Sequence, residues 1–133
     1  MTHATGTFEV KLNKVALDDK GADAMLARMS IDKQFHGVLE AKSKGEMLSA
    51  GTPTKGSAGY VAIERVTGTL GGKHGSFVLQ HNATMTRGVP MLNIIVVPDS
   101  GTDELVGLTG TMKIIIEAGK HSYVFDYTIT EPK

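Results

Sequence analysis

Short segments in which apolar and polar residues alternate run through almost the whole chain, with glycines between them. In residues 7–15, for example, Phe8, Val10 and Leu12 alternate with polar or charged residues, which is the period of a half-buried strand. The 16 glycines are spread along the chain, and valine, isoleucine and threonine together supply 33 of the 133 residues. This pattern predicts an all-β protein.

The alternating segments predict eight strands, at residues 7–15, 27–35, 38–48, 59–69, 76–85, 91–97, 108–117 and 122–130. Good helix formers in residues 22–29 allow one helical turn at most before the second strand, and Gly45 indicates a weak point or a bulge in the third. The connection at residues 50–57 is expected to be the most mobile. Eight strands with short connections are enough to close an antiparallel up-and-down barrel, expected as one domain over residues 1–133.

Charge and composition exclude several classes of function. Fourteen Lys and Arg balance fourteen Asp and Glu, which gives no basis for a phosphate-binding surface, so nucleic acid is not an expected partner. The absence of cysteine excludes disulfides, thiol nucleophiles and cysteine-ligated zinc. No apolar run approaches the length of a membrane helix and residues 1–10 do not form a secretory signal, so we expect a cytoplasmic protein without a membrane partner.

The chain has no motif that binds a metal, a phosphate or a cofactor. Its five histidines (His3, His36, His74, His81 and His121) lack ligand spacing, and all but one are expected at a terminus or in turns. The glycine-rich stretch 68–74 lacks the Walker spacing and favours a hairpin, and there is no Gly-x-Ser-x-Gly nucleophile elbow. We therefore expect neither a metal nor a cofactor.

Polar residues inside the fourth and fifth strands are the remaining candidates for a site. Glu64 and Arg65 are adjacent on one strand, so one of them faces inward. A two-residue Gly71-Gly72 turn of the primed type pairs residues whose numbers sum to 143. That register places Tyr60 and Glu64 on the same face as Phe77 and His81, with Glu64 diagonally opposite His81.

A loop with an odd number of residues would reverse this parity. It would gather Val61 and Ile63 with Phe77 on a cleaner apolar face, away from Glu64. Turn chemistry and apolar segregation thus disagree, and we follow the turn because a barrel with a partly polar lumen does not need clean segregation.

The predicted ligand-binding residues are Tyr60, Glu64, Phe77 and His81, in a lumen that binds a small apolar or amphipathic molecule. One alternative is a cofactor-independent isomerase or cyclase in which Glu64, with a perturbed pKa, is the acid or base. Another is a solid barrel with a structural Glu64–His81 pair that serves in assembly or interaction only. Because a closed barrel has no free edges, we expect a homo-oligomer formed through exposed apolar faces.

Several segments resemble a bacterial family of single-domain proteins known only as a domain of unknown function: GYVAIERVTGTL (59–70), GSFVLQH (75–81), VPDSGT (97–102) and GKHSY (119–123). The resemblance covers nearly the whole chain. Members of that family are similar in fold to the allene oxide cyclases, which are eight-stranded antiparallel barrels. The resemblance implies the barrel and no activity, since the chain contains no cyclase motif and a shared fold does not transfer function.

Overall fold

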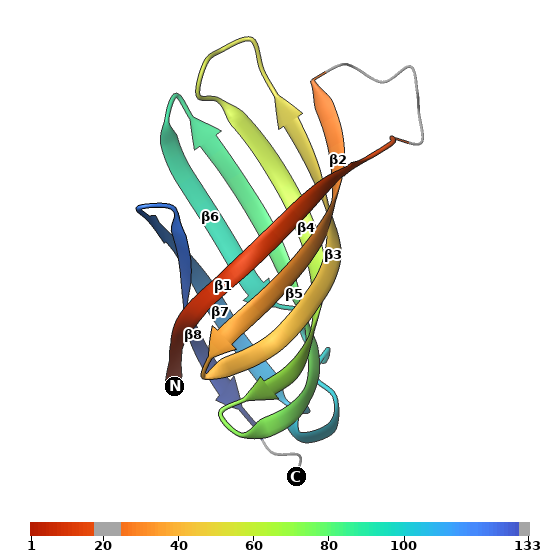
Figure 1. Ribbon diagram of the computed structural model, residues 1–133, viewed down its shortest axis with the longest axis vertical. Helices are drawn as coiled ribbons and strands as arrows, with labels where there is room; N and C mark the ends of the chain where they lie inside the picture. Colours follow the sequence, from red (N-terminus) through yellow and green to blue (C-terminus); the bar gives the residue numbers. More distant parts are fainter. Residues whose placement is uncertain (18–24, 131–133) are drawn as a thin grey trace.

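The structure is a computed structural model that describes residues 1–17 and 25–130. It is a closed barrel in which neighbours along the chain pair antiparallel and β8 returns to β1 (Figure 1). This confirms the all-β, eight-stranded, up-and-down prediction. The elements are β1 (Thr2–Val15), β2 (Leu26–Gly37), β3 (Leu39–Gly51), β4 (Ala58–Leu70), β5 (Lys73–Thr86), β6 (Val89–Val96), the 3₁₀ turn η1 (Asp103–Leu105), β7 (Leu108–Glu117) and β8 (Lys120–Ile129).

Most strands are longer than their apolar alternation predicts. β1 begins at Thr2, and β3 continues to Gly51, which shortens the predicted 50–57 connection to residues 52–57. Backbone pairing with a neighbouring strand is what extends them, and it also places His3, His36, His74 and His121 in strands where the sequence predicts termini or turns. The helical turn predicted at 22–29 lies partly outside the described residues, and β2 already begins at Leu26.

The third strand passes through Gly45 without a bulge. Gly45 pairs with Glu64 in an unbroken register. A Cβ atom at position 45 would lie 2.0 Å from the backbone oxygen of Ile63, so the missing side chain is what lets β3 and β4 approach here.

The register of β4 and β5 is the one predicted from the Gly71-Gly72 turn. Glu64 lies opposite Leu79, so the paired numbers sum to 143. Gly71 and Gly72 have φ of 56° and 85°, the positive values that a primed two-residue turn requires. The odd register is therefore wrong, and Val61 faces outward with half of its surface exposed.

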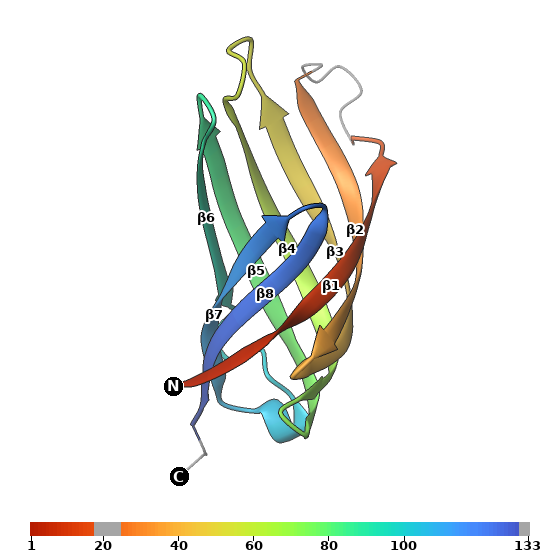
Figure 2. The ribbon, with the colours of Figure 1, turned by 60° about the vertical axis from the view of Figure 1, so that its left-hand side comes forward.

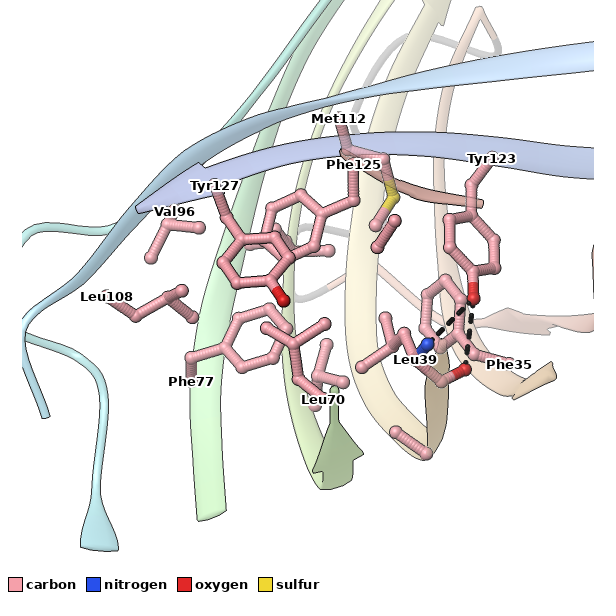
Figure 3. Close-up of a cluster of buried hydrophobic side chains, with 14 of the residues drawn as sticks. Phe35, Leu39, Leu70, Phe77, Val96, Leu108, Met112, Tyr123, Phe125 and Tyr127 are labelled. Carbon is pink, nitrogen blue, oxygen red and sulfur yellow. Dashed lines mark hydrogen bonds between the residues drawn. The ribbon is translucent and has the colours of Figure 1, made fainter. Parts of the chain in front are cut away.

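One end of the barrel is filled by a packed hydrophobic core (Figure 3). This is the end with the β2–β3 and β4–β5 turns, at the bottom of Figure 1, and we call it the closed end. Phe77 stacks on Phe125 with ring centroids 5.7 Å apart, and Phe35 meets Tyr123 edge to face at the same separation. The aromatic rings fill the lumen, so this half of the barrel is solid.

The Tyr123 hydroxyl ties β8 to the β2–β3 turn across the core. It accepts a hydrogen bond from the Leu39 backbone N–H at 3.0 Å. Its own proton points to two backbone carbonyl oxygens, that of Leu39 at 3.1 Å (Figure 3) and that of His36 at 3.0 Å. The hydroxyl therefore satisfies backbone groups that the turn leaves without partners.

The opposite end, with the 52–57 and β5–β6 connections, is open. β6 forms eight residue pairs with β5 but only two with β7, at Ile94 and Ile95. Beyond them β6 stands apart from the shorter β7–β8 hairpin in both ribbon views (Figures 1 and 2). We call this gap the β6–β7 seam. Residues 89–93 of β6 have no strand partner on that side among the described residues, so the barrel does have edges, contrary to our expectation.

Replacing Tyr123 by phenylalanine should lower the free energy of unfolding by about 1–3 kcal/mol, because the buried Leu39 N–H then has no acceptor. Tyr127→Phe is the matched control, since this tyrosine also packs in the core but its hydroxyl has no hydrogen-bond partner among the described residues. Denaturant unfolding of both variants is the measurement. Equal losses would show that the Tyr123 hydrogen bonds contribute nothing specific.

Candidate ligand-binding site

The inward faces of β4 and β5 carry the predicted site residues. On β4 the buried positions alternate, so that Ala62, Glu64 and Val66 face the lumen and Arg65 faces solvent. On β5 the inward face includes His81 and Ala83. The Gly71-Gly72 turn sets this parity, and with it the meeting of Glu64 and His81 inside the barrel.

Glu64 is fully buried and is the centre of a hydrogen-bond network. Its Oε1 accepts a hydrogen bond from the Ser43 hydroxyl at 2.7 Å. Its Oε2 accepts from the Lys33 ammonium at 2.8 Å and from His81 Nε2 at 2.6 Å. Both carboxylate oxygens are therefore satisfied by side chains of three other strands, β2, β3 and β5.

The network keeps the carboxylate ionised. Burial by itself raises the pKa of Glu64, but the hydrogen bond from His81 and the positive charge of Lys33 outweigh it and lower this pKa from 4.5 to about 2. At neutral pH Glu64 is thus a hydrogen-bond acceptor and neither an acid nor an effective base. The isomerase alternative requires a perturbed pKa at Glu64, and the shift found here is one that favours the ionised form.

Lys33 is the counter-ion of Glu64, and the sequence analysis missed it. Its ammonium lies 5.1 Å from the ring centroid of Phe8 and 5.7 Å from that of Phe35, so the rings and the carboxylate together replace its water. The signal was present, because Lys33 shares the parity of the apolar residues Ile31 and Phe35 in β2. Ser43, also missed, shares the inward parity of Leu39 and Ala41, but the weak alternation of β3 concealed it.

Tyr60 lies beside the network, closer to the open end. Its ring centroid is 6.4 Å from that of His81. Burial raises the pKa of the Tyr60 phenol, and the negative charge of Glu64 raises it further. The phenol is therefore protonated at neutral pH and available as a hydrogen-bond donor.

An apolar cavity of about 510 Å³ occupies the open end, within the size range of small-molecule sites. Tyr60 of β4 and Ala83 of β5 lie on its wall. On the inward faces of these strands, Tyr60 is two residues from Ala62 and Ala83 is two residues from His81. The charge network thus lies just below the cavity, between it and the solid closed end. The other walls come from β3, β6 and β7, with residues such as Ser49, Leu92 and Ile116.

The structure brings three of the four predicted site residues together. Tyr60, Glu64 and His81 form one cluster between cavity and core. Phe77 does not join them, because it lies in the packed closed end against Phe125 and does not border the cavity. In the described part of the chain, no three His, Asp or Glu side chains are grouped so that they would hold a metal ion.

Fold and site together define a small antiparallel β-barrel with an ionised network buried beneath an open apolar cavity. The chain belongs to a family described as a protein of unknown function (DUF3224), whose model matches residues 4–127. It is 53% identical to a protein of unknown function from the same family in Shewanella oneidensis MR-1, whose crystal structure matches with a TM-score of 0.94 over 99% of each chain. Comparison with curated proteins finds no match. Within residues 1–17 and 25–130, no helix is long and apolar enough to cross a membrane.

The low pKa of Glu64 makes stability depend on acid pH. Between pH 4.5 and about 2 the unfolded carboxyl gains a proton while the folded one does not, so stability falls as pH falls through this window, by on the order of 3 kcal/mol in total. Glu64→Gln should remove this part of the pH dependence of stability. The measurement is the free energy of unfolding at intervals of about one pH unit from pH 6 to pH 2. Glu117→Gln, at an exposed position, should keep it. Identical slopes in wild type and Glu64→Gln would contradict the assignment.

Proposed function

We propose that this protein binds a small apolar or amphipathic molecule in the open end of its barrel. The observation that carries the proposal is an apolar cavity of about 510 Å³ placed directly above a buried polar network. A barrel that needed only stability would gain more from filling this end with side chains, as it fills the closed end. The apolar walls supply burial, and Tyr60 and His81 supply orientation.

The β6–β7 seam supports the proposal because it opens the cavity to the side. Residues from both edges of the seam, Met91 and Leu92 on one and Ile116 on the other, border the cavity. Met91 and Ile116 are each about three-fifths exposed, so apolar surface lines the way in. A ligand can reach the lumen without unfolding any strand pair.

The isomerase or cyclase alternative finds less support. It requires Glu64 to exchange a proton with a substrate, but both carboxylate oxygens already accept hydrogen bonds from Ser43, Lys33 and His81, and the pKa of Glu64 is about 2. We further propose that the barrel is similar in fold to the allene oxide cyclases. We also propose that the protein is cytoplasmic and that it binds its ligand without a metal or a cofactor.

Filling the cavity should abolish binding. The neutral fluorophore N-phenyl-1-naphthylamine is expected to bind wild type with enhanced, blue-shifted emission. Ala83→Phe should lower its affinity at least tenfold, because Ala83 lies on the cavity wall with its side chain inward. Thr128→Phe, at an exposed position on the outer face of β8, should not. A wild type that gives no emission change, and that carries no small molecule by native mass spectrometry, would contradict the proposed function.

We also propose that a second copy of the chain covers the outer face of β2–β5. A hollow of about 910 Å³ lies there, and Leu48, Val61 and Ile63, which border it, are each about half exposed. Leu48 and Val61 are register partners at its centre, and the ion pair between Arg28 and Glu46 lies beside them. A two-fold axis through this patch would place apolar surface on apolar surface.

Sedimentation tests the dimer. Wild type is expected to sediment as a dimer at micromolar concentration, and Val61→Lys as a monomer, because each copy then brings a charge to the contact whose register partners, Leu48 and Asn82, carry none. Ile115→Lys is the control, since it changes an exposed isoleucine on β7, away from this face. A wild-type monomer would contradict the proposal.

A further inference from the structure

We infer that the open-end cavity selects a neutral ligand with a hydroxyl head group, whose O–H donates to His81 Nδ1 and whose oxygen accepts from the Tyr60 hydroxyl. The inference rests on the proposed function and names the ligand class for the same site. It follows from which atoms of the buried network are already engaged and which are left open.

The proton that His81 shares with Glu64 is carried by Nε2 of the imidazole. An ionised Glu64 only accepts hydrogen bonds, so the 2.6 Å contact between its Oε2 and His81 Nε2 requires the proton to be on Nε2. In the neutral imidazole the other ring nitrogen, Nδ1, then carries a lone pair. Glu64 thus orients His81 so that it offers an acceptor to anything on its other side.

No described residue uses this acceptor. In the part of the chain that the structure describes, neither His81 Nδ1 nor the Tyr60 hydroxyl has a hydrogen-bond partner, although the His81 side chain is only 4% exposed. Among the same residues, no side-chain nitrogen or oxygen that is sealed from solvent lacks a partner. Both atoms therefore border space that water or a ligand atom can enter. Tyr60 itself lines the open-end cavity, and His81 lies directly below it, with its ring centroid 6.4 Å from that of Tyr60.

The two open atoms are of opposite hydrogen-bonding type. Nδ1 is an acceptor, and the Tyr60 phenol is a donor because its pKa is raised. A hydroxyl group matches both, because it donates one hydrogen bond and accepts another. An ether or ester oxygen satisfies only Tyr60 and leaves Nδ1 without water or partner, which costs affinity.

A carboxylate head group fits less well. It has no proton for Nδ1 and brings a second negative charge close to Glu64. The buried cation Lys33 already pairs with Glu64 and lies against the rings of Phe8 and Phe35, on the closed-end side of the network. The site therefore favours a neutral hydroxyl head group over a carboxylate.

Displacement of N-phenyl-1-naphthylamine at about pH 8, where imidazole is ordinarily neutral, tests the inference with three probes of similar size. These are 1-octanol, 1-methoxyheptane and octanoate. Octanol is expected to displace the fluorophore at a concentration at least tenfold lower than methoxyheptane, with octanoate weakest. Tyr60→Phe and His81→Phe should each reduce the preference for octanol over methoxyheptane, and the ratio within each variant removes any general change in affinity.

The outcomes separate the two proposals. If the fluorophore binds but octanol and methoxyheptane displace it equally, or octanoate displaces it best, the head-group inference is overturned while the ligand-binding function stands. If neither the fluorophore nor any probe binds, the proposed function itself fails. Should His81→Phe not fold because Glu64 loses a partner, Tyr60→Phe and the wild-type comparison still decide, since the Tyr60 hydroxyl bonds to no described residue.

Discussion

A carboxylate without solvent contact in the middle of the barrel governs the arrangement around it. An isolated buried charge costs many kcal/mol, so Glu64 persists only because Lys33, His81 and Ser43 reach its two oxygens from three other strands. Each of those side chains must face inward at the right level, which ties together the registers of β2, β3, β4 and β5. A shift of one residue in any of these pairs would turn a partner outward and leave a buried charge unpaired.

The network also divides the barrel into two halves with different physical tasks. Toward the closed end, stacked and edge-to-face aromatic rings fill the lumen, and the Tyr123 hydroxyl satisfies the β2–β3 turn. Toward the open end, β7 and β8 are ten residues each, shorter than β5, and β7 stops pairing with β6 after two residue pairs. Stability therefore comes mostly from one half, which leaves the other free to keep a cavity with a side entrance.

A buried ion pair is weak evidence for stability, because well-packed apolar residues of the same volume are often as good. Its retention at this place agrees better with a role in holding His81 in one orientation. An imidazole whose Nε2 is fixed by a carboxylate presents a defined atom, Nδ1, on its other side. The buried polar residues then recognise the ligand. The packing of the aromatic core offsets the free energy that their burial costs.

The sequence by itself determined the class of fold, the number of strands and the β4–β5 register. Alternation of period two is a local property, and the Gly71-Gly72 turn requires positive φ at two adjacent residues, so both can be read without knowing the rest of the chain. The meeting of Glu64 and His81 follows from that one hairpin. Lys33 and Ser43 were within reach of the same reasoning about parity, but their pairing with Glu64 depends on β2–β3 and β3–β4 registers that no local turn signal fixed. The β6–β7 seam, the solid closed end that holds Phe77, and the open cavity were decided only by the tertiary structure. They depend on how far each pair of neighbouring strands stays paired once the sheet closes, and on which side chains then meet in the lumen.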